Sequence, residues 1–129
     1  MTSFIGSFHV IFVHFPVALL TTSVLCYIFA LFNKSSLSVF IKFYEIHRIL
    51  LFLGLAFVLP TVITGLIHSW SWNPNMGLLW HKFSGLVLLC STAGYWMFDK
   101  SNQYYLGYVL LIGILTIVTG HLGGVLTHG

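Results

Sequence analysis

From Met1 to Asn33 the chain reads MTSFIGSFHVIFVHFPVALLTTSVLCYIFALFN, a stretch without a single Asp, Glu, Lys or Arg. Three further stretches share this lack of charged residues: Ile49–His81, Phe83–Phe98 and Ser101–Gly129. Each approaches or exceeds the ~17–25 apolar residues that are needed to cross a bilayer as a helix. The first stretch and its three counterparts therefore predict a multi-pass membrane protein.

The composition of the whole chain supports the same class. Only 5% of the 129 residues are charged and 58% are hydrophobic, whereas a soluble domain carries about 25% charged residues. We therefore expect a single transmembrane domain over residues 1–129, in contact with the lipid bilayer. The five basic residues are too scattered to bind nucleic acid. Cys26 and Cys90 lie singly in apolar runs, which excludes a CxxC redox pair and a CxxCH haem-attachment site.

The apolar stretches are continuous, so they predict helices rather than alternating barrel strands. We expect four helices over about 7–32, 41–68, 77–98 and 103–126, with Trp70 and Trp72 as interface anchors in the turn at 69–75. Residues 99–102 form the last connection. Short connections make sequential helices antiparallel neighbours, so the fold class is an all-α, up-down-up-down bundle of four transmembrane helices.

The basic residues orient this bundle through the positive-inside rule. Lys34, Lys42, Arg48 and Lys100 fall on the side of the first and third connections, and Lys82 falls on the side of both termini. This asymmetry predicts both termini on the outer, periplasmic face of a bacterial inner membrane.

The histidines stand out because their number, seven, equals the number of charged residues. Four of them lie about 18–20 residues from the inner edge of their helix, which is ~27–30 Å at 1.5 Å per residue. This layer contains one histidine from each helix: His14, His68, His81 and His121. His9 and His128 lie further out on the same side, and His47 alone lies near the inner side.

A histidine near a membrane interface is commonly a boundary residue, and we expect this for His9, His47 and His128 taken singly. A layer of four ionisable residues at depth instead indicates a site. Imidazoles without an acidic ligand suit haem iron, copper or zinc. Copper or zinc would require three or four histidines that converge on one point, whereas haem requires two histidines across a flat slot.

Small residues near the histidines favour haem. Gly85 lies one turn after His81, Gly120 precedes His121, and Gly65 and Gly123–Gly124 lie nearby. Such glycines also serve plain helix packing. Four aromatic residues are candidates to wall a porphyrin, although such residues are more often core: Phe12, Phe15, Trp80 and Phe83.

The pairing of the axial ligands follows from the expected square bundle. Its diagonals join the first helix to the third and the second to the fourth, which favours His14 with His81 and His68 with His121. Two haems at one depth would collide in a regular square, so we expect one or two haem b groups, with His9 and His128 as secondary ligand candidates.

Two motifs resemble those of a known family. The stretch 12–20, FVHFPVALL, resembles the VHFPIALL opening of a bacterial family of small multi-pass membrane proteins of unknown function, and 119–129, TGHLGGVLTHG, resembles its GHxGGxLTHG closing motif. The resemblance extends over the whole chain, mainly by hydropathy between the motifs. Family members occur alone or joined to c-type cytochrome domains, which implies electron transfer at the outer face and roles for His14, His121, His128 and, less directly, His81.

The sequence thus predicts a cytochrome b-like electron-transfer subunit rather than a stand-alone enzyme. We expect it to act near the periplasmic face within a larger redox complex, with other membrane subunits, a periplasmic c-type cytochrome and quinone as partners. The alternatives are a cofactor-free structural or assembly subunit and a copper- or zinc-binding protein. Hydrolytic catalysis is excluded because the two carboxylates, Glu45 and Asp99, lie at the inner edge, far from the histidine layer.

Overall fold

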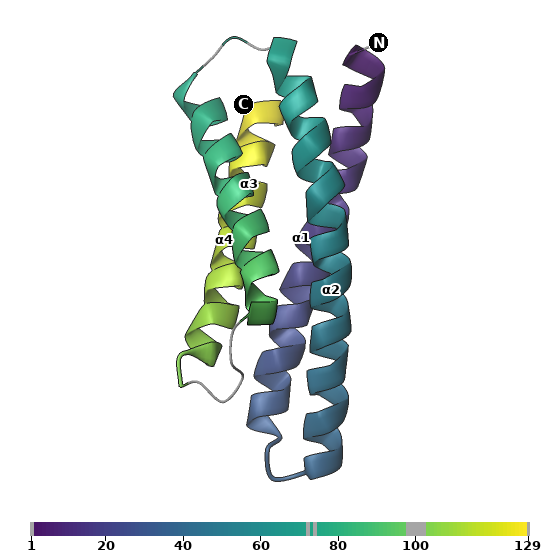
Figure 1. The fold of residues 1–129 in the computed structure, drawn as a ribbon, viewed down its shortest axis with the longest axis vertical. Helices are drawn as coiled ribbons and strands as arrows, with labels where there is room; N and C mark the ends of the chain where they lie inside the picture. The colour runs from purple at the N-terminus through teal and green to yellow at the C-terminus, as the bar shows by residue number, and fades with distance from the viewer. Residues whose placement is uncertain (1, 72, 74, 98–102, 129) are drawn as a thin grey trace.

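The fold is an all-α bundle of four helices, seen in a computed structural model (Figure 1). The structure describes residues 2–71, 73, 75–97 and 103–128, and the side chains of 8–9, 11–70, 73, 75–97 and 103–126. The expected turn around Trp72 and Pro74 and the connection at 99–102 therefore fall largely outside the described residues. The described elements are α1 (Thr2–Phe32), α2 (Leu37–His68), the 3-10 turn η1 (Ser69–Ser71), α3 (Met76–Gly94), the 3-10 turn η2 (Tyr95–Met97) and α4 (Tyr105–His128).

Polar residues set the ends of these helices. Asn33 follows α1 and donates its amide to the Phe29 carbonyl, at 2.8 Å, which satisfies one of the terminal carbonyls. Asn75 precedes α3, and its side chain accepts a hydrogen bond from the backbone N–H of Leu78 at 2.7 Å. These short polar segments end each apolar run, as the sequence predicts.

The helix boundaries differ most from the expected ones in three places. The second helix begins at Leu37 rather than near residue 41. The first helix begins at Thr2 rather than near residue 7, so Pro16 lies in its interior. The third helix ends at Gly94 rather than near 98, because residues 95–97 tighten into the 3-10 turn η2. That turn carries the side chain of Tyr95 into the bundle, where it is 1% exposed.

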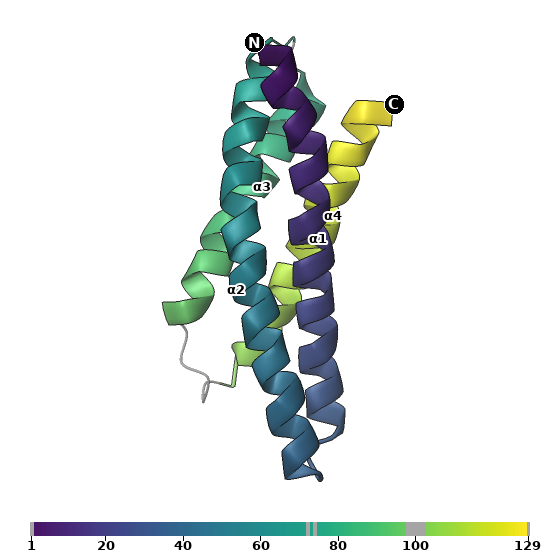
Figure 2. The same ribbon diagram turned by 90° about the vertical axis from the view of Figure 1, so that its right-hand side faces the viewer.

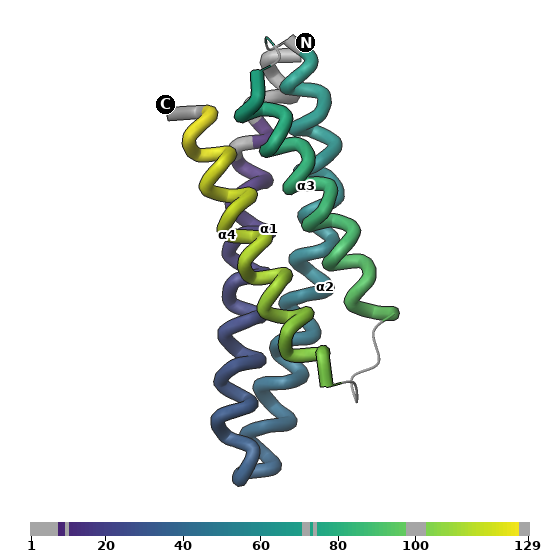
Figure 3. Tube along the Cα trace, turned by 90° about the vertical axis from the view of Figure 1, so that its left-hand side faces the viewer, coloured from purple at the N-terminus to yellow at the C-terminus, as the bar shows by residue number. Residues whose placement is uncertain are grey.

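Sequential helices run antiparallel, and both termini lie at the same end of the bundle (Figure 1). Helix α1 packs against α2 and α4, and α3 packs against the same two helices, so α1 and α3 are diagonal neighbours. We call the end with the two termini the termini end, and the end at which α1 connects to α2 the loop end. Helices α1 and α2 extend beyond α3 and α4 at the loop end (Figures 1 and 3).

Within the described residues, three helical segments are long and apolar enough to cross a membrane: Ile11–Phe32, Leu37–His68 and Tyr105–Leu126. This supports a multi-pass integral membrane protein. Helix α3 is not among them, because polar residues such as His81 and Lys82 lower its hydropathy. Large apolar side chains such as Phe32, Leu37 and Ile117 are exposed on the outside of the bundle, as a lipid-facing surface requires.

The two halves of the bundle are packed differently. Buried apolar side chains fill the interior from the middle of the bundle to the loop end, where Leu20, Leu51 and Ile112 are fully buried. Towards the termini end, α4 leans away from the start of α1 (Figure 2). The interior of that half contains a cavity instead of a core.

His47 corrects one expectation from the sequence. It is fully buried among residues of the loop-end half, with 0% exposure. The interpretation of His47 as a membrane-boundary residue is therefore wrong.

Candidate functional site

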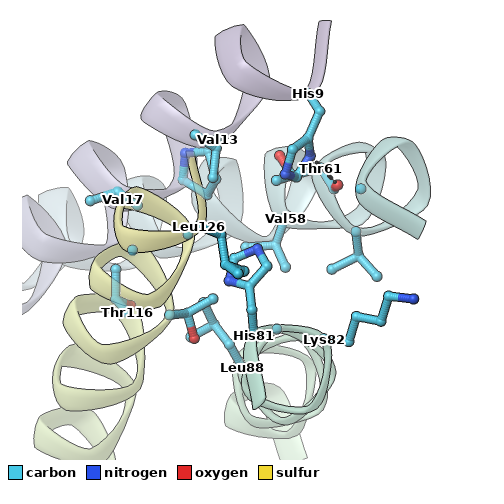
Figure 4. A pocket seen from close by; sticks show the side chains of 18 of the residues that line it. His9, Val13, Val17, Val58, Thr61, His81, Lys82, Leu88, Thr116 and Leu126 are labelled. Atoms are coloured by element: carbon cyan, nitrogen blue, oxygen red, sulfur yellow. Dashed lines mark hydrogen bonds between the residues drawn. The ribbon is translucent and has the colours of Figure 1, made fainter. Parts of the chain in front are cut away.

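A cavity of about 520 Å³ lies between the four helices in the termini-end half of the bundle (Figure 4). This volume is within the ~300–1,000 Å³ of typical small-molecule and cofactor sites. The wall is mostly apolar, with Val17 from α1, Val58 from α2, Leu88 from α3 and Leu126 from α4. Its polar residues include His9, His14, His68, His81, Lys82, Thr61, Thr116 and Thr119.

Glycines make room for this cavity. All five glycines that the sequence analysis placed near the histidines line it: Gly65, Gly85, Gly120, Gly123 and Gly124. At two of these positions a side chain would collide with a histidine. A Cβ on Gly65 would lie 2.7 Å from Cε1 of His9, and a Cβ on Gly123 would lie 2.9 Å from Cε1 of His81.

The His9 ring is oriented by a backbone carbonyl. Its Nδ1 lies 3.0 Å from the carbonyl oxygen of Thr61, which can only accept, so Nδ1 carries the proton. Nε2 of the neutral ring then has its lone pair available. A histidine that binds a metal through one nitrogen usually donates the other N–H to a carbonyl or carboxylate in this way.

The environment of His9 also keeps its ring neutral. Burial lowers the pKa of His9 below its usual value of 6.5, and the neighbouring rings of His81 and His68 act in the same direction. At neutral pH the imidazole is therefore in the form that binds a metal ion.

Two polar atoms of the cavity wall are buried without a hydrogen-bond partner among the described residues. They are Nδ1 of His81 and Oγ1 of Thr119. An unsatisfied buried polar atom costs ~1–3 kcal/mol, and ligands commonly satisfy such atoms. Their position in the wall of a cavity makes a polar or metal-containing ligand the natural partner.

The rings of His9 and His81 lie close together in the cavity. The ring centres of His9 and His81 are 6.4 Å apart, with the planes inclined by 74°. Two imidazoles on opposite sides of one metal place their ring centres ~6 Å apart, since each metal–nitrogen distance is ~2.0–2.1 Å and each ring adds ~1 Å. Figure 4 shows His9 entering from α1 and His81 from the diagonal helix α3.

The structure brings together only part of the predicted histidine layer. His68 joins the cluster, with its ring centre 6.4 Å from that of His9. His14 lines the cavity, although its side chain is largely exposed. His121 is exposed and is not a lining residue, so the expected pair of His68 with His121 is not formed. The side chain of His128 lies outside the described part of the chain.

A histidine of α1 does lie beside a histidine of the diagonal helix α3, but the histidine from α1 is not the expected one. His9 rather than His14 faces His81. A signal for this was present in the sequence, because His9, Val13, Pro16 and Val17 share one helical face by their spacing. All four line the cavity, whereas Phe15, next to His14, is 47% exposed.

The aromatic residues considered for a porphyrin wall do not line the cavity. Phe15, Trp80 and Phe83 are 47%, 56% and 59% exposed, and Phe12 is half-buried outside the lining set. Phe15 instead stacks on Phe57 of α2, with 5.0 Å between the ring centres. Aliphatic side chains and glycines form the wall instead.

The described residues contain no group of three or more His, Cys, Asp or Glu side chains arranged to hold a metal ion. This arrangement would be needed for the copper or zinc alternative, in which three or four histidines converge.

Comparison with known proteins does not add to this description. No protein-family model, no curated protein and no solved structure matches this chain.

Proposed function

We propose that this protein is a membrane-embedded, haem b-binding electron-transfer subunit, with His9 and His81 as the axial ligands of one haem. The observation that carries the proposal is the facing of these two imidazoles, at 6.4 Å between ring centres, inside a mostly apolar cavity of about 520 Å³. His68 and His14, which line the same cavity, are the reserve ligands.

The residues around the cavity fit such a group. The Thr61 carbonyl holds His9 in the orientation of a ligand. Gly65 and Gly123 leave the space in which the two rings stand. Lys82 lines the cavity as well, and its ammonium can pair with the carboxylates at the edge of a haem.

Bound haem would supply reversible one-electron chemistry at the iron. The chain would hold the iron by two neutral imidazoles and exclude water by the aliphatic walls from Val17, Val58 and Leu88. The identity of the ligands and the burial of the group both influence the reduction potential of a haem.

We further propose that α3 is a fourth transmembrane helix. Its 19 residues correspond to ~28 Å, close to the ~30 Å hydrocarbon core of a bilayer. Because α3 packs against α2 and α4, its polar residues His81 and Ser84 can face protein rather than lipid. The charge distribution along the sequence favours a bacterial inner membrane with both termini on the periplasmic side.

The resemblance of residues 12–20 and 119–129 to the family often joined to c-type cytochrome domains supports the partners we propose. These are a periplasmic c-type cytochrome on the termini side, quinone in the membrane, and further membrane subunits of a redox complex.

The test is a reduced-minus-oxidised optical spectrum of the purified full-length chain, together with its iron content. We expect a Soret band and about one haem per chain. His9→Ala and His81→Ala should each reduce haem occupancy at least about tenfold, because each removes an axial ligand. His121→Ala is the matched control and should retain haem, because its side chain lies outside the cavity.

Absence of a Soret band and of iron would contradict the proposal and favour the cofactor-free assembly subunit. Copper or zinc in place of iron would favour the third alternative. Electron transfer itself is tested by mixing the reduced protein with an oxidised c-type cytochrome, and we expect rapid reoxidation that His81→Ala abolishes.

A further inference from the structure

A second polar cluster lies in the loop-end half of the bundle, far from the cavity. Its centre is His47, on α2, which is 11 residues before Val58 and therefore ~16 Å from the nearest part of the cavity wall on that helix. His47 is 0% exposed, Tyr95 is 1% exposed and Tyr105 is 3% exposed. The proposed haem site does not use any of these three side chains.

The hydrogen bonds of His47 determine which ring nitrogen carries the proton. Nδ1 lies 2.9 Å from the backbone carbonyl oxygen of Ser23, which can only accept. The Ser23 hydroxyl donates to the His47 carbonyl at 2.8 Å, so its lone pair faces Nδ1, also at 2.8 Å. Nδ1 is therefore the protonated nitrogen, and Nε2 of the neutral ring is an acceptor.

This assignment gives a direction to a chain of hydroxyl groups. Tyr95 must donate to Nε2 of His47, at 3.0 Å. The hydroxyl oxygen of Tyr95 then accepts from Tyr105, and the oxygen of Tyr105 accepts from Tyr44, at 3.3 Å. The four groups come from α2, η2 and α4, and each O–H points towards His47.

The two ends of this series of hydrogen-bonded groups differ in solvent exposure. Tyr44 is half-buried and lies one turn closer to the loop end than His47. Burial raises the pKa of Tyr95 to about 12, so its hydroxyl remains a protonated donor at neutral pH. Protons thus have a graded route from the half-buried hydroxyl to the fully buried imidazole, through Tyr105 and also through the direct interaction of Tyr44 with Tyr95.

We propose that Tyr44, Tyr105 and Tyr95 form a proton-transfer path and that His47 is the proton-accepting site at its end. The step moves protons only. A hydronium ion from the solvent gives a proton to the Tyr44 oxygen and is left as water. Tyr44 gives its own proton to Tyr105, Tyr105 gives its own to Tyr95, and the Tyr95 O–H bond breaks as the Nε2–H bond of His47 forms. The product is one imidazolium, with each hydroxyl restored and its direction reversed.

The surroundings of His47 determine how well it holds the added charge. The Ser23 carbonyl keeps its bond from Nδ1 in either state, and the Tyr27 ring, 5.0 Å away between ring centres, can interact with a cation. Tyr44 and Tyr95 face it as neutral phenols, at 6.0 and 5.6 Å between ring centres. Arg48, the next residue on α2, opposes the added charge.

The path is independent of haem binding and is tested in the full-length protein in lipid nanodiscs. The protonation of His47 is followed by infrared spectroscopy after a light-released proton pulse, with His47→Gln identifying its imidazolium band. We expect Tyr105→Phe and Tyr44→Phe to slow this protonation at least about tenfold, because each removes one hydroxyl from the path.

The matched control is Tyr108→Phe, one turn further along α4. It removes a hydrogen bond of the same kind, from the Tyr108 hydroxyl to the Ser91 carbonyl at 2.7 Å, but lies outside the path. We expect His47 to be protonated in this variant at the wild-type rate. Tyr44→Phe keeps the test valid if Tyr105→Phe fails to fold, since Tyr44 is only half-buried.

Three results would overturn the proposal. One is a wild-type rate in Tyr44→Phe or in folded Tyr105→Phe, and another is equal slowing in Tyr108→Phe. The third is a His47 ring that stays neutral between about pH 4 and pH 9. Each of these would leave the cluster as a purely structural network that fixes the register of the helices.

Discussion

The two ends of the bundle place imidazoles in opposite environments. At the loop end, His47 is fully buried and both of its ring nitrogens are hydrogen-bonded to Ser23 or Tyr95. At the termini end, Nδ1 of His81 is buried in a cavity wall without a partner among the described residues. The same side chain is thus part of the packed core in one half and available to a ligand in the other.

This difference follows from how the helices approach one another. In the loop-end half, Gly54 brings α2 so close to α1 that a Cβ there would lie 2.4 Å from Cδ2 of Leu20. In the termini-end half, Gly65 and Gly123 face the rings of His9 and His81, and Gly124 has nothing within 4 Å. Close packing leaves no room for a ligand at one end, and its absence provides room at the other.

The largest expected effect comes from removing an imidazole from each end. His47→Leu should lower the free energy of unfolding by ~2–4 kcal/mol, because it leaves the polar groups of Ser23 and Tyr95 buried and unsatisfied. His81→Leu should lower it by less, because Nδ1 of His81 has no hydrogen-bond partner among the described residues and the ring loses only its interaction with the Thr119 backbone. Thermal unfolding in detergent measures both, and equal losses would contradict the comparison.

Substitution of the glycines tests the cavity without touching a histidine. Gly65→Ala places a Cβ 2.7 Å from the His9 ring, which must move and lose its bond to Thr61, so haem should bind about tenfold more weakly. Gly107→Ala is the control, since Gly107 lies outside the cavity and its Cβ would have nothing within 4 Å. Haem titration of the apoprotein compares them, and equal affinities would show that the His9 position does not matter.

Acidification should affect the termini end through His9. Its pKa is lowered in the folded protein, so the folded state binds fewer protons than the unfolded state below pH 6.5. The stability and the haem affinity should therefore be highest above pH 6.5 and fall as the pH drops. The affinity should fall by up to about tenfold per pH unit for each ligand that becomes protonated. Absorbance at the Soret band against pH measures this, and haem retention independent of pH would contradict it.

The smallest effect is expected on the outside of the bundle. Trp80→Leu should change haem affinity and protein stability by less than ~0.5 kcal/mol, because Trp80 is 56% exposed and does not line the cavity. Haem titration measures the change in affinity, and thermal unfolding measures the change in stability. A large loss of haem affinity would indicate that Trp80 forms part of the haem-binding wall, as the sequence suggested.

The charge-free stretches were sufficient to predict an all-α bundle with four helices, and the structure confirms it. The nearness of five glycines to the histidines in the sequence suggested that they lie at the candidate site, and all five line the cavity. The periodicity of one helix cannot show how far a neighbour stands from it. Depth along the helix alone selected His14, although the helical face that His9 shares with Val13, Pro16 and Val17 pointed to His9. This is why His14 and His81 were expected to pair, whereas His9 faces His81 in the structure.

Hydropathy alone determined that this chain forms helices suited to a membrane, because an apolar backbone segment must satisfy its own hydrogen bonds there. The tertiary structure decided which imidazoles meet a cavity and which are hydrogen-bonded in the core. His47 shows this most clearly, since its partners Ser23 and Tyr95 come from other elements of the chain. Only the packing of helices at their observed angles brings those groups within hydrogen-bonding distance.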